Sequence, residues 1–209
     1  MSQPDMLSPK AKHFASLEEV INALKRMKND PLAEAGTNVV ISRGNPNAKL
    51  LLIGEAPGPE ENVKGKPFVG RAGQMLDKVL QAANFDPEKD VYITNSVFRM
   101  PPGEDGKPFR KPTTEEIDYY RPYVFEIIRL VDPRVILLTG NVACQSVLQK
   151  TGITSLRGKW TQMDGRWIMP IFHPSYLLRN PTRDPGSPKA LMWEDIREVR
   201  KKYDELVHS

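Results

Sequence analysis

The apolar residues of this chain gather into four short continuous runs, separated by longer amphipathic stretches. The runs cover residues 49–53, 91–95, 135–139 and 167–172. Continuous apolar runs of this length are typical of strands that are buried on both faces of a sheet. In the stretches between them, apolar positions three and four residues apart predict helices. The predicted helices cover residues 16–27, 71–83, 114–130, a stretch from about 141, and 187–206, and a shorter strand is predicted at residues 39–41.

Strand and helix alternate four times along the chain, which is the pattern of a parallel sheet covered by helices on both faces. The predicted fold class is therefore α/β, a three-layer α/β/α sandwich with a central four-stranded parallel sheet. A chain of 209 residues fits one such domain. We place it at residues 16–209, after a polar, flexible N-terminal arm at residues 1–15. Ser16 and Glu19 have capping-box spacing at the start of its first helix.

Composition limits the classes of ligand, the cellular compartment and the types of site expected for this domain. The formal net charge is +4, a mildly basic balance that is compatible with binding nucleic acid but does not require it. No apolar run approaches the ~20 residues that span a bilayer, and the first residues lack a signal-peptide pattern, so we expect a cytoplasmic protein with no membrane contact. The single cysteine, Cys144, rules out an internal disulfide, and no zinc spacing, phosphate-binding loop or serine elbow is present.

Two segments far apart in sequence place polar side chains directly after predicted strands. Glu55 lies in the Gly/Pro-rich segment 54–58, and His173 begins the segment 173–179. In open α/β sheets ligands bind at the carboxyl ends of the strands, so both residues are expected at one cleft. A carboxylate there can activate or position a water, and a histidine can donate a hydrogen bond to a developing anion. The alternative is that both residues belong to ordinary structural turns.

Two further segments carry residues suited to binding a flat ring. Phe68, between glycines before a predicted helix, can stack on such a ring or serve as a core anchor, and Gly70 and Gly73 can admit a phosphate at the helix N-terminus. Asn95 offers the donors and acceptor needed to read an amide edge, or it bridges neighbouring loops.

Two leucines and an arginine follow His173 in a turn that begins with proline. Leu177 and Leu178 beside Arg179 suit insertion into a base stack with a hold on a phosphate, or else the leucines belong to the core.

Taken together, these segments resemble family 4 of the uracil-DNA glycosylase superfamily. The matching motifs are residues 54–58, 65–73, Asn95 with 101–103, and 173–179, in the family's order and spacing. The resemblance implies a parallel four-stranded sheet between helices, in a monomer that binds uracil-containing DNA, single- or double-stranded. It implies a monofunctional glycosylase of base-excision repair, which flips uracil out of DNA, hydrolyses its N-glycosidic bond and leaves an abasic site.

The resemblance also implies roles for individual residues. Glu55 would position or activate the attacking water, and His173 would stabilise charge at O2 of the departing uracil. Phe68 would stack on the base and Asn95 would read its Watson–Crick edge. Backbone groups near Ala56 and Gly58 would line the pocket. The residues expected to contact DNA are Ser175, Tyr176, Leu177, Leu178, Arg179, Gly70 and Arg71.

The chain departs from the family at the four cysteines that usually bind a [4Fe–4S] cluster. Met27, Asp30, Arg99 and Tyr120 occupy those places, and one cysteine cannot supply four thiolates. We therefore expect no metal and no cofactor. We expect contacts among the four replacements instead, such as one between Asp30 and Arg99, to join the same segments.

A second departure is the loop at residues 103–112, which is longer than is usual in the family. Lys107, Arg110 and Lys111 either contact phosphate there or are solvated. Three other functions remain open: a glycosylase with a lesion range shifted to hypoxanthine or xanthine, a branch that forms a covalent DNA adduct, and a non-catalytic binder of uracil-containing or single-stranded DNA. The covalent branch uses a histidine in a basic insert, and residues 60–65 contain none.

Overall fold

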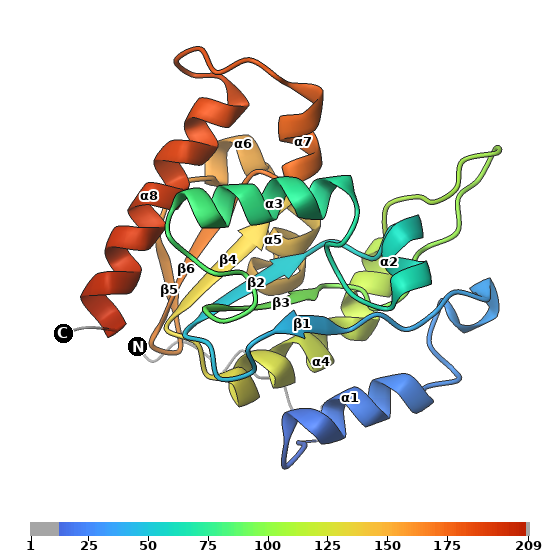
Figure 1. Cartoon of the computed structure of the whole chain (residues 1–209). Helices are drawn as coiled ribbons and strands as arrows, with labels where there is room; N and C mark the ends of the chain where they lie inside the picture. Colours follow the sequence, from blue (N-terminus) through green and yellow to red (C-terminus); the bar gives the residue numbers. More distant parts are fainter. Residues whose placement is uncertain (1–12, 208–209) are drawn as a thin grey trace.

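The computed structural model describes residues 13–207, in which a central sheet is flanked by helices on both faces (Figure 1). The strands are β1 (Ser42–Gly44), β2 (Leu50–Gly54), β3 (Val91–Asn95), β4 (Val135–Thr139), β5 (Thr161–Met163) and β6 (Arg166–Ile171). The α-helices are α1 (Leu17–Arg26), α2 (Pro59–Lys64), α3 (Arg71–Ala82), α4 (Thr114–Val131), α5 (Gly140–Leu148), α6 (Ile153–Leu156), α7 (Pro174–Arg179) and α8 (Pro188–Val207), and η1 (Ala33–Ala35) is a 3₁₀ turn.

The sheet confirms the α/β class and extends the predicted strand count. Its order is β1-β3-β2-β4-β6-β5, and the four predicted strands form its parallel centre. Both edge strands are antiparallel, so the sheet is six-stranded and mixed rather than four-stranded and parallel. The edge strands escaped prediction because each is three residues long and largely polar, with no apolar run to signal burial.

The strand predicted at residues 39–41 is wrong in position. Val39 makes only an isolated bridge to Arg99, and the edge strand begins at Ser42. Val40 and Ile41 are apolar because they are buried in the core, not because they belong to a sheet. An apolar run signals burial, and here burial occurs without strand pairing.

Two apolar layers cover the sheet, and side chains alternate between them along each strand. On β2, Leu51 and Ile53 join the layer that contains α1, α4 and α5, while Leu50 and Leu52 join the layer with α3, α7 and α8. All four side chains are fully buried, and such burial contributes about 1.5–3 kcal/mol per side chain. The three-layer arrangement follows from this division.

Capping side chains define the starts of α1 and α4. The Glu19 backbone N–H donates to Ser16 Oγ at 3.2 Å, as the spacing predicted, but the Glu19 carboxylate accepts from the N–H of Ala15 at 2.9 Å rather than from that of Ser16. At α4, Thr113 and Glu116 form the full reciprocal pair. The short helices α2, α6 and α7 were not predicted, because four to six residues carry too little periodicity.

Most of the N-terminal arm, residues 1–12, lies outside the described residues. At its end, the Phe14 backbone N–H donates to the Glu126 carboxylate at 3.0 Å, and Arg129 donates to the Phe14 carbonyl at 2.7 Å. Residues 13–15 are therefore bound to α4, and the arm and the domain boundary stay predictions. Within residues 13–207, no helix is long and apolar enough to cross a membrane.

Candidate active site

The candidate site lies where the four parallel strands end. Gly54 pairs with Asn95 at the ends of β2 and β3, and Thr139 pairs with Ile171 at the ends of β4 and β6. Glu55 follows β2 directly, and His173 follows β6 after one further residue. The strand arrows of Figure 1 share this edge. Parallel pairing therefore brings side chains that are far apart in sequence to one place.

Phe68 and Asn95 meet over the backbone of Gly54. A Cβ placed on Gly54 would lie 2.4 Å from Phe68 Cζ and 2.5 Å from Asn95 Oδ1, so only glycine leaves room for both. The ring centroids of Phe68 and His173 are 6.0 Å apart. A Cβ on Gly140, after β4, would lie 3.2 Å from His173 Cβ. The structure thus gathers the predicted ring, amide and imidazole at one strand edge.

Phe68 reaches this position through an unusual backbone conformation. Its φ is +53°, in the left-handed region that a bulky residue rarely adopts. A Cβ on Gly73, in the first turn of α3, would lie 1.8 Å from the Phe68 carbonyl oxygen. Gly73 therefore serves close packing of α3 against the Phe68 backbone, rather than the approach of a phosphate.

Glu61 holds the same loop in place, and sequence reasoning missed it. Its carboxylate accepts hydrogen bonds from the backbone N–H groups of Val69 at 2.9 Å and Gly70 at 2.8 Å, and from Gly58 at 3.2 Å. The Gly70 N–H, which we expected to face phosphate, is thus already occupied. The signal was present, since Gly58 and Glu61 have the three-residue spacing of a helix N-terminal box.

The orientation of His173 is set by Ser175. The Ser175 backbone N–H donates to His173 Nδ1 at 3.2 Å, and the Ser175 hydroxyl lies 2.9 Å from the same atom. Because Nδ1 accepts, the proton of the neutral imidazole is on Nε2. Burial, together with the charges of Arg179 and Lys111, lowers the pKa of His173 to about 4. At neutral pH the ring is therefore an uncharged donor.

Glu55 and Asn95 keep their polar groups available. Burial raises the pKa of the Glu55 carboxyl, and the charge of Lys111 lowers it in part. Asn95 is buried. Neither side chain makes a hydrogen bond to any residue between 13 and 207. Neither residue is among those of the described chain whose side-chain polar atoms are cut off from solvent without a partner, so water can reach these groups and a ligand can take its place. Ala56 and Gly58 are half-buried beside Glu55.

The residues expected to contact DNA differ in their exposure to solvent. Leu177 is buried in the apolar layer with α3 and α8, so it is not available to enter a base stack. Leu178 is half-buried, and Tyr176 and Arg179 are exposed. Of the two leucines, it is therefore Leu178 that is available to enter a base stack. Arg71, at the start of α3, is also exposed.

The four residues that the resemblance places at the family's cluster positions form a connected polar network. Asp30 accepts hydrogen bonds from Arg99 Nε at 3.0 Å and from the Tyr120 hydroxyl at 2.6 Å. Arg99 Nη2 donates to the Met27 carbonyl at 3.2 Å. Burial and the bond to Asp30 raise the pKa of Tyr120, so its hydroxyl stays a donor. The predicted contact between Asp30 and Arg99 is confirmed.

These residues do not fit an iron–sulfur cluster, because none offers a thiolate. The one cysteine, Cys144, is buried in α5, and burial raises the pKa of its thiol to about 12. No group of three or more His, Cys, Asp or Glu side chains among the described residues is placed to hold a metal ion.

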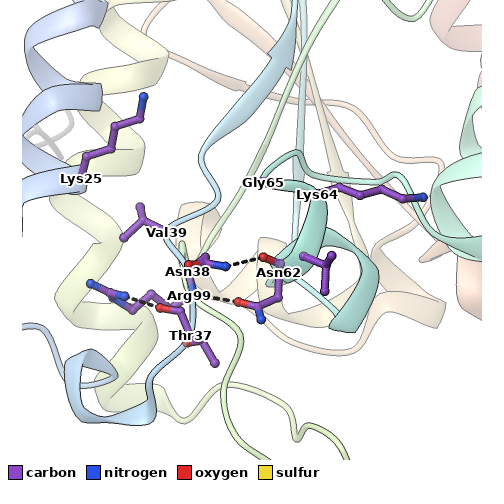
Figure 2. Close-up of a pocket in the computed structure, with 9 residues that line it drawn as sticks. Lys25, Thr37, Asn38, Val39, Asn62, Lys64, Gly65 and Arg99 are labelled. Carbon is purple, nitrogen blue, oxygen red and sulfur yellow. Dashed lines mark hydrogen bonds between the residues drawn. The ribbon is translucent and has the colours of Figure 1, made fainter.

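An open hollow lies beside this network and apart from the candidate site (Figure 2). Arg99 donates to the Thr37 carbonyl at its edge, and Asn38 and Asn62 bond to each other across it at 2.7 and 2.8 Å. Neither Glu55 nor His173 lines it. We therefore assign the chemistry to the strand edge and not to this hollow.

Comparison with known proteins identifies the family of the chain. The family model described as "Uracil DNA glycosylase superfamily" matches residues 41–197, which include the whole strand edge. The chain belongs to this superfamily. It is 35% identical to the type-4 uracil-DNA glycosylase of Thermotoga maritima, over 88% of this chain and 93% of that protein. It is 33% identical to that of Archaeoglobus fulgidus, over 79% and 85%, and 31% identical to that of Sulfurisphaera tokodaii, over 89% and 84%.

Within the superfamily these relatives place the chain in family 4, as its motifs predicted. Relatives covering most of the chain are hydrolases of N-glycosyl bonds by name. The superfamily's substrate is DNA. The chain is therefore a family 4 member with a single cysteine, and hydrogen bonds from Arg99 and Tyr120 to Asp30 join three of its segments.

Proposed function

We propose that this chain is a monofunctional uracil-DNA glycosylase of base-excision repair, acting as a monomer on single- or double-stranded DNA. The observation that carries the proposal is the meeting of Phe68, Asn95 and a neutral His173 at one strand edge, beside Glu55. An aromatic face, an unpaired amide and a neutral Nε2–H donor match the ring, the imide edge and the O2 of uracil.

The reaction begins with extrusion of the uridine from the DNA, which costs a few kcal/mol. The base then stacks on Phe68, and the Asn95 amide pairs with its N3–H and O4. Cytosine presents an amino group and an unprotonated ring nitrogen there, so an amide fixed for uracil opposes two mismatched groups. This edge therefore favours uracil over cytosine.

Bond cleavage is divided between two residues. The C1′–N1 bond breaks, and its electron pair leaves with uracil as an anion whose O2 accepts a hydrogen bond from His173 Nε2–H. Glu55 orients the water and takes its proton as the water oxygen bonds to C1′. The uracil anion then takes up a proton from solvent and Glu55 releases the one it holds, so the products are uracil and an abasic site. A fixed donor to a developing anion contributes roughly 10²–10³ in rate.

A neutral imidazole is the suitable donor here. Because its pKa is lowered to about 4, His173 carries no charge at neutral pH and can stabilise an anion without first losing its proton. The raised pKa of Glu55 makes that carboxylate a better base than an exposed one. No lysine in the motifs is placed for Schiff-base chemistry, so no strand cleavage follows.

We further propose that the chain works without a cluster or other cofactor. One cysteine cannot ligate a four-thiolate cluster. The hydrogen bonds from Arg99 and Tyr120 to Asp30, called here the Asp30 network, join the segments in which the resemblance places the family's cluster ligands. Leu178 fills the space that the flipped base leaves, and Tyr176, Arg179 and Arg71 contact the strand.

The test is excision from single- and double-stranded oligonucleotides that contain one uracil, read as strand breaks after alkali. We expect breaks at uracil only, with matched hypoxanthine and xanthine substrates measuring the lesion range. Glu55→Gln and His173→Ala should each lower the single-turnover rate about 10²-fold or more, while Lys89→Gln, at the opposite end of β3, should not. Absence of breaks at high enzyme concentration would refute the proposal and favour a non-catalytic DNA binder.

A further inference from the structure

The segment after β3 folds into a tight hairpin. Asp105 and Gly106 have φ values of +53° and +78°, and the Lys107 N–H donates to the Glu104 carbonyl at 3.1 Å. Two consecutive positive φ angles closed by this bond are the features of a type I′ turn, the turn that matches the twist of paired strands. A Cβ on Gly103 would lie 1.9 Å from the Lys107 carbonyl oxygen, so the two arms are in close contact.

The arms of the hairpin are paired and its base is anchored. Pro102 and Phe109 form an antiparallel bridge, and the Arg110 N–H donates to the Pro101 carbonyl at 3.2 Å. The Arg110 guanidinium makes two hydrogen bonds to the buried Glu116 carboxylate, at 2.7 and 2.9 Å. Arg110 is therefore an anchor to α4 and not a group free to bind phosphate.

Two cations and one aromatic ring remain available on this hairpin. Lys107 and Lys111 are exposed, and neither ammonium group has a hydrogen-bond or ion-pair partner in the described part of the chain. The Phe109 side chain is 45% exposed. Of the acidic residues, Glu104 lies 3.8 Å from Arg110 and Asp105 occupies the turn.

The hairpin stands beside the candidate site. It continues from β3, and in Figure 1 the yellow-green segment projects beyond the edge at which β2 and β3 end. Lys111, at its base, is near enough for its charge to lower the pKa of both Glu55 and His173. A strand of DNA with its nucleotide in the site therefore passes this hairpin.

We propose that the hairpin, residues 101–111, binds the unpaired DNA strand next to the extruded nucleotide, with Lys107 and Lys111 on phosphates and Phe109 stacked on a base. Unpaired cations along a backbone path, combined with an exposed aromatic ring, are how proteins bind single strands without reading sequence. The inference deepens the proposed function and takes the identity of its ligand from it.

Fluorescence anisotropy with an undamaged, labelled single-stranded oligonucleotide tests the hairpin without requiring excision. Phe109→Ala should weaken binding roughly 5- to 150-fold, the usual effect of losing one stacked base. Lys107→Gln and Lys111→Gln should each make the slope of log affinity against log salt shallower by about 0.7, since each removes one phosphate contact. Lys89→Gln and Lys150→Gln, two exposed lysines outside the hairpin, are the charge-matched controls.

The outcomes separate this inference from the proposed function. If Phe109→Ala and Lys107→Gln bind as the wild type does while uracil excision is normal, the inference is wrong and the glycosylase assignment stands. If binding depends on the hairpin but the wild type excises no uracil, the glycosylase assignment fails and the binding site stands. Circular dichroism and a melting temperature like those of the wild type, measured for Phe109→Ala and Lys107→Gln, show that folding is intact.

Discussion

The Asp30 network offers the sharpest test of how this scaffold is held together. Asp30→Asn keeps the size of the side chain but removes its charge. The Asp30 side chain is 1% exposed and that of Arg99 13%, so solvent can do little to replace the lost partner. The new amide can still accept from Tyr120, but it then presents a donor to the Arg99 Nε–H. Losing one partner of a buried charged pair costs about 3–5 kcal/mol.

Because part of the hydrogen bonding survives in Asp30→Asn, we expect the free energy of unfolding to fall by about 3 kcal/mol, the low end of this range. For a chain of this size each kcal/mol lowers the melting temperature by about 2–4 °C, so the expected fall is roughly 6–12 °C in thermal unfolding followed by circular dichroism. The matched control is Asp132→Asn, which removes the same charge from a pair with Arg166 in which the carboxylate is 67% exposed, so that solvent can replace the lost partner. Exposed pairs contribute about 0–1 kcal/mol, so this control should lose less than about 4 °C.

Equal shifts in Asp30→Asn and Asp132→Asn would refute this reasoning. A double-mutant cycle of Asp30→Ala with Tyr120→Phe gives a second, independent measurement, because each of these changes removes the hydrogen bond between the Tyr120 hydroxyl and Asp30. We expect a coupling free energy above about 0.5 kcal/mol, the level at which distant sites are simply additive. Coupling below that level would mean that the two side chains are neighbours without a shared stabilising interaction.

Three further predictions concern the site and the cofactor. Gly54→Ala should lower uracil excision about 10²-fold or more with DNA binding retained, because the added Cβ would displace Phe68 and Asn95. Gly36→Ala strains its own left-handed backbone (φ +67°) but meets no neighbouring atom, so it should keep the rate, and equal loss in both variants would contradict this geometry. The single-turnover rate should rise with pH as Glu55 loses its proton, with a midpoint above the ordinary carboxyl pKa of 4.5. Titration of His173 should cause no change in rate above about pH 4. A change in rate near pH 6.5 that vanishes in His173→Asn would contradict this prediction. Purified protein should contain no stoichiometric iron, and chelation should leave its melting temperature and activity unchanged, whereas a brown, iron-containing preparation would overturn the cluster-free proposal.

The proposed replacement of a cluster by the Asp30 network would change what the scaffold depends on. A cluster joins its segments by metal–thiolate bonds that oxidation and chelation can break. Hydrogen bonds from Arg99 and Tyr120 to one buried carboxylate join the same segments without metal or redox chemistry. The cost is that the network works only while every member is paired, because a half-satisfied buried network is worse than an apolar one.

The sequence alone determined the centre of the fold. The runs at 49–53, 91–95, 135–139 and 167–172 became the four parallel strands, because a strand buried on both faces must be apolar throughout. It did not determine the sheet's edges. Short polar strands such as β1 are defined by their hydrogen bonds to a neighbour and not by their own composition.

The motifs around Glu55, Phe68, Asn95 and His173 were likewise visible in sequence, because each follows a strand or begins a helix. Only the tertiary structure decided which side chains lie in contact and which groups are already hydrogen-bonded within the protein. Leu177 is buried in the core, and the Gly70 N–H donates a hydrogen bond to Glu61. These outcomes depend on packing between segments far apart in the chain, and a single sequence records such contacts only through residue types that many other arrangements would also accept.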